Sequence, residues 1–552
     1  MKKRKLWATA GSEELRRRFF QLIADHQYPC NTNLQNKNII LHCTQAGGLG
    51  DVSHIFHCAE TIRKNRPDAD IDVLIQPETV TKERISSLFP VDRFKTQFFD
   101  NSDYFGSTAK FEDLSKKGYP IGIAVGLTTS GNCHYRNPHF RMVREYGFAF
   151  HPNTKESTLS MGLGGDEEGM NFPSIQPRTL TDITSDWLKG ALNIHSPDDM
   201  AGYLRERKLY HMYMHNWTTQ IASLYSVATL ENQNNQSLDV FIPLEYSLKQ
   251  YIDWGILNLD FFQKHKIGKL VRVTPEGTEV IHLGPGKEMR ILSGSIPKAD
   301  MEAIQQHSQP FFGCTGDLSF SEAVVLNKSP IYDAESFKKH FLNTLKNTAK
   351  ERGYEHFARF IDLLQRQTVS EDGIYESPAI KPKKQGGWYG SEVAFHLGGL
   401  LSEPNSSNSI YTAKCIKALA PQLCSFGEEI ARCYTPQLLE EAQALNSYLP
   451  ENCNFDFRLI DMVNRGMYLK NYPDLIQVEN QLWEKFNAGQ ITEKQVIESL
   501  SAAIENCTES SRNSSASDSP IPDESIVTTS SDEEMADTSS GSYQVKGLRF
   551  QK

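Results

Sequence analysis

The stretch that decides the fold runs from Pro310 to Asp333 and reads PFFGCTGDLSFSEAVVLNKSPIYD. Its first five residues, 310–314, form an apolar run with the length of a short buried strand. Residues 315–317 (Thr-Gly-Asp) supply a turn, and Lys-Ser-Pro at 328–330 ends the segment that follows it. A second strand is then expected to begin at Ile331. The stretch therefore predicts a strand, a glycine turn, a helix and a second strand.

The helix of this unit is indicated by Phe320, Ala323 and Val324, which recur at helical spacing. We expect Asp317 or Ser319 to cap it. A small-residue turn that ends a strand and opens a helix gathers unpaired N–H groups at the positive end of the helix dipole. Such a place suits an anion, although most helices have capping residues of this kind without binding a ligand.

An acidic residue, Glu322, stands one turn into the same helix. In nucleotide-binding parallel sheets an acidic residue near the phosphates bonds a ribose hydroxyl, and Glu322 is placed to do so. A solvated glutamate on a helix surface is the alternative interpretation.

The segment from Arg290-Ile-Leu-Ser-Gly-Ser-Ile-Pro297 to Asp333 resembles the donor half of GT-B glycosyltransferases, and the resemblance covers roughly residues 270–333. It implies that the turn and helix after residue 314 hold the diphosphate of a nucleotide-sugar, and that the glutamate holds the ribose. The donor-binding residues implied here are Gly294, Thr315, Gly316, Asp317, Ser319, Ser321 and Glu322.

A second strand, glycine turn and helix lie near the start of the chain. Residues 37–44 read as a strand, and QAGGLGDVS (45–53) leads into a helix that extends to about Lys64. Its apolar residues recur at one-face spacing, and a further strand is expected at 69–77. This is the opening unit of a Rossmann-like half.

The run TQAGGLGDVSHIFHCAETIRK (44–64) resembles the first strand, loop and helix of GT-B enzymes, including starch and glycogen synthases and protein-arginine rhamnosyltransferases. In the rhamnosyltransferases a Gly-Asp at this loop supplies the catalytic carboxylate, which implies Asp51 as the base here. His54 and His57, which are expected to project away from the apolar face of the same helix, come second. Alternatively, Asp51 only caps its helix. The donor side is implied to include Gly47, Gly48 and Gly50.

The reaction expected from this pair of loops is an inverting, metal-independent glycosyl transfer. A carboxylate or histidine takes the acceptor proton, and helix amides stabilise the leaving diphosphate, with Arg290 as a further countercharge. His211 and His215 have a metal-compatible spacing if that segment is helical, but no third ligand is evident. We expect no metal and no cofactor apart from the nucleotide-sugar co-substrate.

Other segments carry weaker signals. The histidine-rich loop 129–139 follows a predicted strand at 121–128 and is either an acceptor site or an exposed loop. The glycine loop 161–170 has no strand immediately before it, so we do not interpret it as a phosphate loop. Residues 180–203 have helical character. The lysine-rich passage 380–390 is expected to be an exposed loop.

Composition limits the class of protein. Of 552 residues, 39% are hydrophobic and 23% are charged, which is typical of a globular protein with two to four domains. The net charge of −10 argues against a nucleic-acid partner. Ten scattered cysteines without a CxxC pair, no apolar run of membrane-helix length and no signal peptide after the basic start indicate a protein of a reducing cytoplasm.

The end of the chain differs from the rest. Residues 508–545 carry eight acids and one arginine among many serines, and cannot bury enough apolar surface to fold alone. The run 530–537 resembles the acidic tails of type IV secreted bacterial effectors, which implies export into a host cell. It equally resembles an ordinary disordered tail, and composition does not separate the two.

The predicted fold class is therefore α/β, with two Rossmann-like halves of GT-B type, an additional C-terminal helical region and a disordered acidic tail. Helical stretches are expected at 335–367, 411–443 and 482–504. An epimerase or hydrolase of the same fold, which would release free sugar, and a non-catalytic interaction protein remain alternatives. The identity of the acceptor, whether a small molecule, a lipid or a protein, stays open.

The predicted domain divisions are an N-terminal helix (1–36), an acceptor half (37–205), a donor half (206–334), a helical region (335–507) and a tail (508–552).

Overall fold

A computed structural model of the chain describes residues 26–30, 37–45, 49–77, 80–98, 123–127, 140–144, 158–163, 169–214, 217–244, 246–333, 339–368 and 423–515, with single positions at 15, 18, 19, 22, 23, 34 and 421. The chain divides into a large compact unit, residues 1–500, and a small one, residues 501–552. The account below concerns the large unit. The loops predicted at 129–139 and 380–390 and the tail after residue 515 lie outside the described residues.

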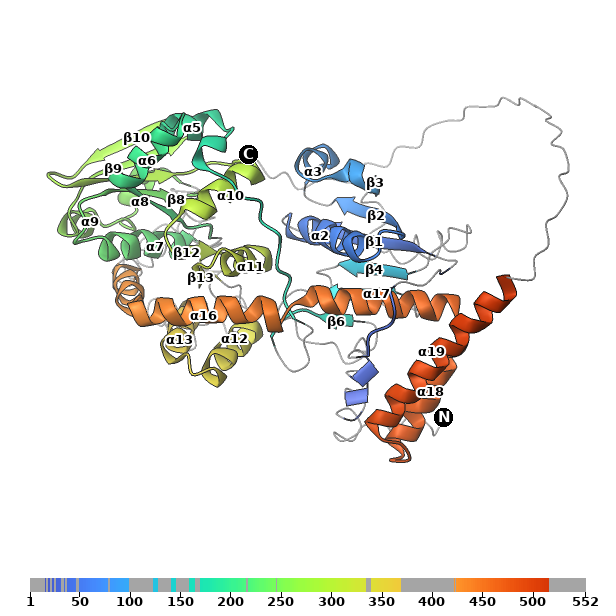
Figure 1. Cartoon of the computed structure of the whole chain (residues 1–552). Helices are drawn as coiled ribbons and strands as arrows, with labels where there is room; N and C mark the ends of the chain where they lie inside the picture. Colours follow the sequence, from blue (N-terminus) through green and yellow to red (C-terminus); the bar gives the residue numbers. More distant parts are fainter. Residues whose placement is uncertain are drawn as a thin grey trace, which may run out of the picture. The chain divides into compact units, whose positions relative to one another are not determined.

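The first half contains a six-stranded sheet in which every neighbouring pair is parallel. The strand order is β3-β2-β1-β4-β5-β6, so the chain starts in the middle, builds one side and then returns to build the other (Figure 1). Its strands are β1 (Asn38–Gln45), β2 (Asp70–Pro77), β3 (Lys95–Phe98), β4 (Ile123–Leu127), β5 (Phe140–Arg144) and β6 (Thr158–Ser160).

The first crossover shows why this half folds as predicted. Strand β1 is apolar and buried, as a central parallel strand must be. Helix α2 (Gly50–Asn65) follows it and buries one face, including Val52, Ile55 and Ile62. Strand β2 then pairs with β1 in parallel. The predicted strand, helix and strand of the first half are present, while residues 46–48 of the predicted glycine turn lie outside the described residues.

The second half contains a five-stranded sheet in the order β10-β9-β11-β8-β7 and a parallel pair, β12-β13. Its pairs are parallel except for the hairpin of β9 and β10. The strands are β7 (Arg207–His211), β8 (Ser237–Phe241), β9 (Ile267–Thr274), β10 (Gly277–His282), β11 (Lys287–Leu292), β12 (Phe311–Cys314) and β13 (Ser329–Tyr332). The predicted α/β class with two Rossmann-like parallel sheets is confirmed.

A close backbone approach beside β7 joins these two groups of strands. Met212, directly after β7, forms a parallel bridge to Gly313 of β12, and the N–H of Tyr213 donates to the carbonyl of Gly313 at 3.2 Å. A Cβ at residue 313 would lie 2.8 Å from the Cα of Met212 and 2.6 Å from Cε of Met214. Only glycine allows the two backbones to approach this closely.

Helices cover the strands of both halves (Figure 1). The helices between and just after the strands of the first sheet are α2, α3 (Lys82–Leu88) and the 3-10 turns η1 (Val91–Arg93) and η3 (Leu180–Asp182). With the second sheet come α5 (Asp186–Leu192), α6 (Pro197–Glu206), α7 (Trp217–Leu230), α8 (Leu248–Asp253), α9 (Leu259–Lys264), α10 (Lys298–His307) and α11 (Asp317–Val325). The C-terminal helices are α12 (Lys339–Glu351), α13 (Glu355–Thr368), α16 (Pro436–Asn452), α17 (Phe455–Asn471), α18 (Asp474–Asn487) and α19 (Glu493–Ser515).

Two successive helices of the C-terminal region pack against the sheets rather than against each other (Figure 1). Helix α16 contacts α11, α13 and β13, whereas α17 contacts α2 and β4. The backbone of Met170 also pairs with the segment just before α17, since the N–H of Met170 donates to the carbonyl of Cys453 at 2.6 Å. Residues far apart in sequence therefore complete the same packing units.

The helical character expected at 180–203 is present as η3, α5 and most of α6, and Asn193 in a left-handed conformation ends α5. Two other local predictions need correction. The glycine loop 161–170 does follow a strand, since β6 ends at Ser160. The last strand of the donor unit begins at Ser329 rather than Ile331, with Pro330 inside it; a proline supplies no N–H but is compatible with an extended backbone.

A buried ion network holds the middle of the second sheet together. Asp239 of β8 has no exposed surface and accepts from both Arg207 and Arg290, at 2.8 and 2.5 Å, and from the hydroxyl of Tyr203 at 2.7 Å. Burial alone would raise the pKa of Asp239, but the two guanidinium groups lower it. Arg290 also donates to the carbonyl of Ala191. These bonds engage Arg290 in the structure of the sheet.

We predict that Asp239→Asn lowers the free energy of unfolding by about 3–5 kcal/mol, because two buried guanidinium groups lose their counter-charge. Chemical denaturation measures the effect. The matched control is Asp253→Asn, which removes an exposed ion pair with Lys249 on α8 and should change stability by no more than roughly 0.5 kcal/mol. Equal effects of the two variants would contradict this account of the network.

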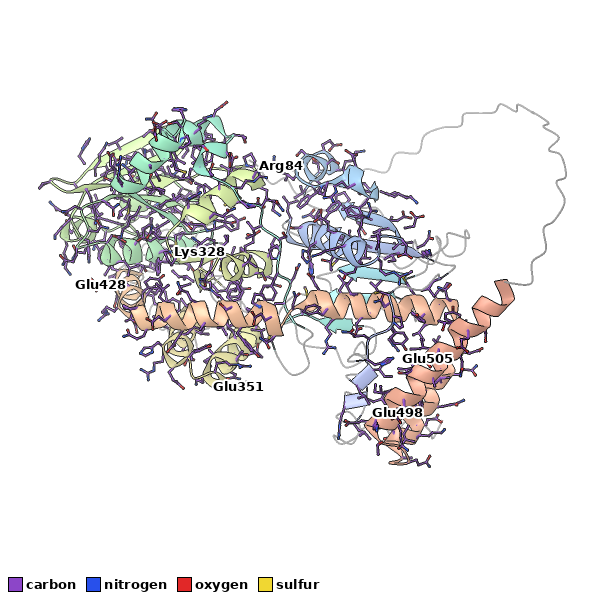
Figure 2. The ribbon with its side chains drawn as sticks, in the orientation of Figure 1. Arg84, Lys328, Glu351, Glu428, Glu498 and Glu505 are labelled. Carbon is purple, nitrogen blue, oxygen red and sulfur yellow. The ribbon has the colours of Figure 1, made fainter. Side chains whose placement is uncertain are left out.

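Lys328, labelled in Figure 2, is a buried cation just before β13, with 7% of its surface exposed. Its Nζ donates to the carbonyls of Ser308 at 2.5 Å and Gln306 at 3.3 Å, where α10 ends. A cation at a helix C-terminus satisfies carbonyls that have no partner within the helix. Burial lowers the pKa of Lys328 to about 8.

This lowered pKa predicts how stability depends on pH. Between about pH 8 and the ordinary lysine pKa near 10.4, the unfolded chain holds a proton at Lys328 that the folded chain has lost, so stability rises with pH. The rise from pH 8 to pH 10 amounts to about 2 kcal/mol. It is measured as the difference between the pH profiles of the natural protein and of Lys328→Met, which lacks the titrating group. Parallel profiles would show that burial does not shift this lysine.

Candidate functional site

The turn after β12 forms the centre of the candidate donor site. Strand β12 ends at Cys314, and helix α11 begins at Asp317 with Gly316 as its N-cap residue. Gly316 has φ 77° and ψ 164°, a conformation open essentially to glycine only. The prediction that Asp317 or Ser319 caps the helix is wrong: the N-cap residue has no side chain, and both candidates lie inside the first turn. The helix therefore opens without a side-chain cap from its N-cap position.

The polar residues of this turn hold it in place. Thr315 donates through its hydroxyl to the carbonyl of Asp333 at 3.0 Å, which ties the turn to the end of β13. Asp317 accepts from the hydroxyl of Tyr332 at 3.2 Å. Ser319 donates to the carbonyls of Thr315 and Gly316. The backbone at the start of α11 is thus fixed by its own side chains.

Unlike the residues of the turn, Ser321 and Glu322 of the implied donor site are buried within α11. Ser321 is fully buried in α11, and Glu322 is buried with 9% of its surface exposed. Burial raises the pKa of Glu322, while a hydrogen bond from Gln305 of α10 works against that rise. Gly294 lies two residues after the end of β11, where a Cβ would lie 2.8 Å from side-chain carbons of both Trp187 and Pro275.

The order of the strands gives this turn its significance. In an open parallel sheet, ligands bind outside the carboxyl ends of the strands, where the chain order reverses direction. In the second half the order reverses between β7 and β12, since β8 and β11 continue on one side of β7 and β12 and β13 on the other. The start of α11 lies at this reversal. Sequence spacing alone could not place it there.

The first half repeats the arrangement. Its order reverses between β1 and β4, and the loop that leads to α2 begins at the carboxyl end of β1. Gly50 is the first residue of α2, and Asp51 is half-buried in its first turn. The N-cap residue, Leu49, makes no side-chain capping bond. Gly47 and Gly48 lie outside the described residues.

The two histidines of α2, predicted to project away from its apolar face, are half-buried and lie beside helix α17. The ring of His54 lies 6.2 Å from that of Phe455 in α17, and its Nε2 is buried with no hydrogen-bond partner in the described part of the chain. Burial, with a smaller effect of His57, lowers the pKa of His54 to about 3. A neutral imidazole of such low basicity is a poor proton acceptor at neutral pH.

His57 has a defined partner instead. Its Nε2 lies 2.8 Å from Oδ1 of Asp456 at the start of α17 and 3.3 Å from the hydroxyl of Thr61. This bond links α2 to α17 across 399 positions of sequence. Asp456 and Gln305 are the two polar residues near the predicted site that sequence analysis missed. Neither stands in a motif, so no signal in the sequence distinguishes them from surface polar residues.

The two glycine-turn units are brought together. Helices α2 and α11, which open with the two turns, contact each other within the large unit. In contrast, Arg290 is engaged by Asp239. His211 lies in strand β7 and not in the helix that a metal pair with His215 would require, and His215 lies outside the described residues. His211 is buried against Phe312, with ring centroids 4.3 Å apart.

The described residues contain no group of three or more His, Cys, Asp or Glu side chains suited to holding a metal ion. None of the helices that the structure describes combines the length and apolar character of a membrane span.

No protein-family profile and no curated protein matches the chain. A search of solved structures found similar folds, and the GT-B resemblance seen in the sequence recurs there. MurG of Acinetobacter baumannii is 9% identical over 75% of this chain and 99% of its own, with a TM-score of 0.32. A Listeria monocytogenes protein described as a UDP-N-acetylglucosamine 2-epimerase is 10% identical over 71% and 94%, with a TM-score of 0.32. LpCGTa in complex with UDP is 11% identical over 74% and 99%, with a TM-score of 0.26.

These neighbours are nucleotide-sugar enzymes of the GT-B type. Identities of 9–11% and TM-scores of 0.32 and below are too low to transfer an activity, a substrate or a residue role to this chain. The function must be inferred from its own residues.

The glycine at the start of α11 can be tested against that at the start of α2. We predict that Gly316→Ala lowers the free energy of unfolding by about 1–3 kcal/mol, because a side chain is strained at this backbone conformation. Gly50→Ala is the control, since Gly50 is not among the glycines with positive φ and a Cβ there meets nothing within 4 Å. Thermal unfolding should show no loss for Gly50→Ala; a comparable loss in both would refute the distinction.

Proposed function

We propose that this protein is a glycosyltransferase of GT-B type that moves a sugar from a nucleotide-sugar donor to an acceptor, with inversion and without a metal ion. The observation that carries the proposal is the position of the uncapped start of α11 at the point where the strand order of the second sheet reverses. That is where parallel α/β sheets bind nucleotides.

The donor would be held by the second half. N–H groups at the start of α11 and the positive end of its dipole suit a diphosphate, and the turn before it is fixed by Thr315, Asp317 and Ser319. Glu322 follows in the same helix as the ribose ligand, and Gly294 lies just after strand β11 of the same half. The same N–H groups would stabilise the charge that develops on the leaving diphosphate.

The acceptor would be activated by the first half. Asp51 would take the proton of the acceptor as the acceptor attacks the anomeric carbon. The new glycosidic bond then forms as the bond between that carbon and the diphosphate oxygen breaks, and the electron pair leaves with the diphosphate. Asp51 is favoured over His54, since His54 is buried against α17 with a pKa of about 3. The acceptor, whether small molecule, lipid or protein, is left to experiment.

The first experiment is a thermal-shift screen with UDP, GDP, dTDP and ADP sugars, each with and without Mg²⁺. A ligand at one hundred times its dissociation constant adds about 2.7 kcal/mol to stability, which such a screen detects readily. Stabilisation by one nucleotide, independent of Mg²⁺, supports the proposal and names the base. If no nucleotide stabilises the protein, the interaction-protein alternative replaces it.

We predict that Asp51→Asn abolishes turnover but keeps nucleotide binding, whereas Glu322→Ala loses nucleotide binding. The reason is that Asp51 would act on the acceptor and Glu322 on the donor. Calorimetry and a product assay separate the two effects, and the reverse pattern would contradict the assignment. Release of free sugar without any acceptor would favour the hydrolase or epimerase alternative.

A further inference from the structure

Glu322 is not held by its own helix alone. The side-chain amide of Gln305 in α10 donates from Nε2 to Oε2 of Glu322 at 3.0 Å. Both side chains are buried, Gln305 with 2% and Glu322 with 9% of its surface exposed. A carboxylate in such surroundings is costly unless hydrogen bonds are supplied to it, and Gln305 supplies one.

The orientation of this amide is informative. Oε1 of Gln305 is buried and has no hydrogen-bond partner among the residues that the structure describes. No other described group therefore dictates which end of the amide faces Glu322. The N–H end faces the carboxyl group, so Glu322 is the acceptor of this bond.

Both helices are anchored independently of this bond. The end of α10 is capped by Lys328, and the neighbouring Gln306 accepts from the N–H of Arg178 at 3.0 Å and donates to the carbonyl of Gln176 at 2.8 Å. In α11, Phe320 packs against Tyr332 and Phe341. Gln305 and Glu322 thus meet at a fixed separation before any ligand arrives. Ordering in advance lowers the entropy that binding must offset.

We propose that Gln305 is a positioning residue for donor binding: by bonding Oε2 of Glu322, it directs the other carboxylate oxygen, Oε1, to accept from the ribose hydroxyls of the nucleotide. This inference rests on the proposed function and adds to it a source of selectivity. The enzyme should prefer a ribonucleotide over the same nucleotide without ribose hydroxyls, and Gln305 should be required for that preference.

The test compares the dissociation constants of a nucleoside diphosphate and its 2′,3′-dideoxy analogue by calorimetry, with the base found in the nucleotide screen. Gln305→Met, which keeps length but has no donor, should weaken the ribonucleotide about tenfold, the equivalent of one hydrogen bond to a charged group. The dideoxy analogue should be affected less than twofold. The double variant Gln305→Met/Glu322→Gln should bind no more weakly than Glu322→Gln alone, since the two residues act as one unit.

Two further variants keep the result interpretable. Gln306→Met, on the same helix, is the matched control and should leave the ribose preference unchanged. Gln305→Asn, whose amide is one carbon too short to reach Glu322, should reproduce the loss of preference if Gln305→Met does not fold. Equal weakening of both nucleotides, additive effects in the double variant, or no change would overturn the role of Gln305 while nucleotide binding stands. Failure of the natural protein to bind any nucleotide would instead overturn the proposed function.

Discussion

The close approach of Met212 and Gly313 is the constraint on which the second half of the molecule depends. A parallel bridge and backbone hydrogen bonds, from Tyr213 to Gly313 and from Gln309 to Leu209, connect the strands built from residues 207–292 to the pair built from residues 311–332. The bridge exists only because residue 313 has no Cβ to meet the backbone of Met212. Through it the strand order reverses beside β7, and this reversal creates the place where a loop and the start of a helix meet at the edge of the sheet.

The surrounding interactions stabilise that arrangement from several sides. The ion network of Asp239 holds β7, β8 and β11 together within the sheet, and Lys328 satisfies the last carbonyls of α10. The turn before α11 is fixed by its own hydroxyl groups and by Tyr332. The start of α11 is therefore ordered by these contacts, and the donor site proposed there would be preorganised for its ligand.

The C-terminal helical region contacts elements of both halves of the core. Helices α16 and α17 follow each other in sequence, yet one packs on elements of the second half and the other on α2 and β4 of the first. The bond between His57 and Asp456 and the contact of His54 with Phe455 bring α17 to the helix that carries Asp51. The helical region thus takes part in shaping the first half. The boundaries of the predicted domains remain predictions.

The sequence by itself determined the local units: two strand, glycine turn and helix combinations, their parallel sheets and the residues of the α11 turn. These follow from periodicity and from glycine and proline, which act over a few residues. The tertiary structure alone decided the strand order, the burial of His54, and the partners Gln305 and Asp456. Those depend on contacts between residues up to 399 positions apart, and such contacts leave no pattern in neighbouring residues. The N-cap position of α11 also depends on tertiary structure. It falls on Gly316, where the chain leaves the paired strand β12, and not on Asp317 or Ser319.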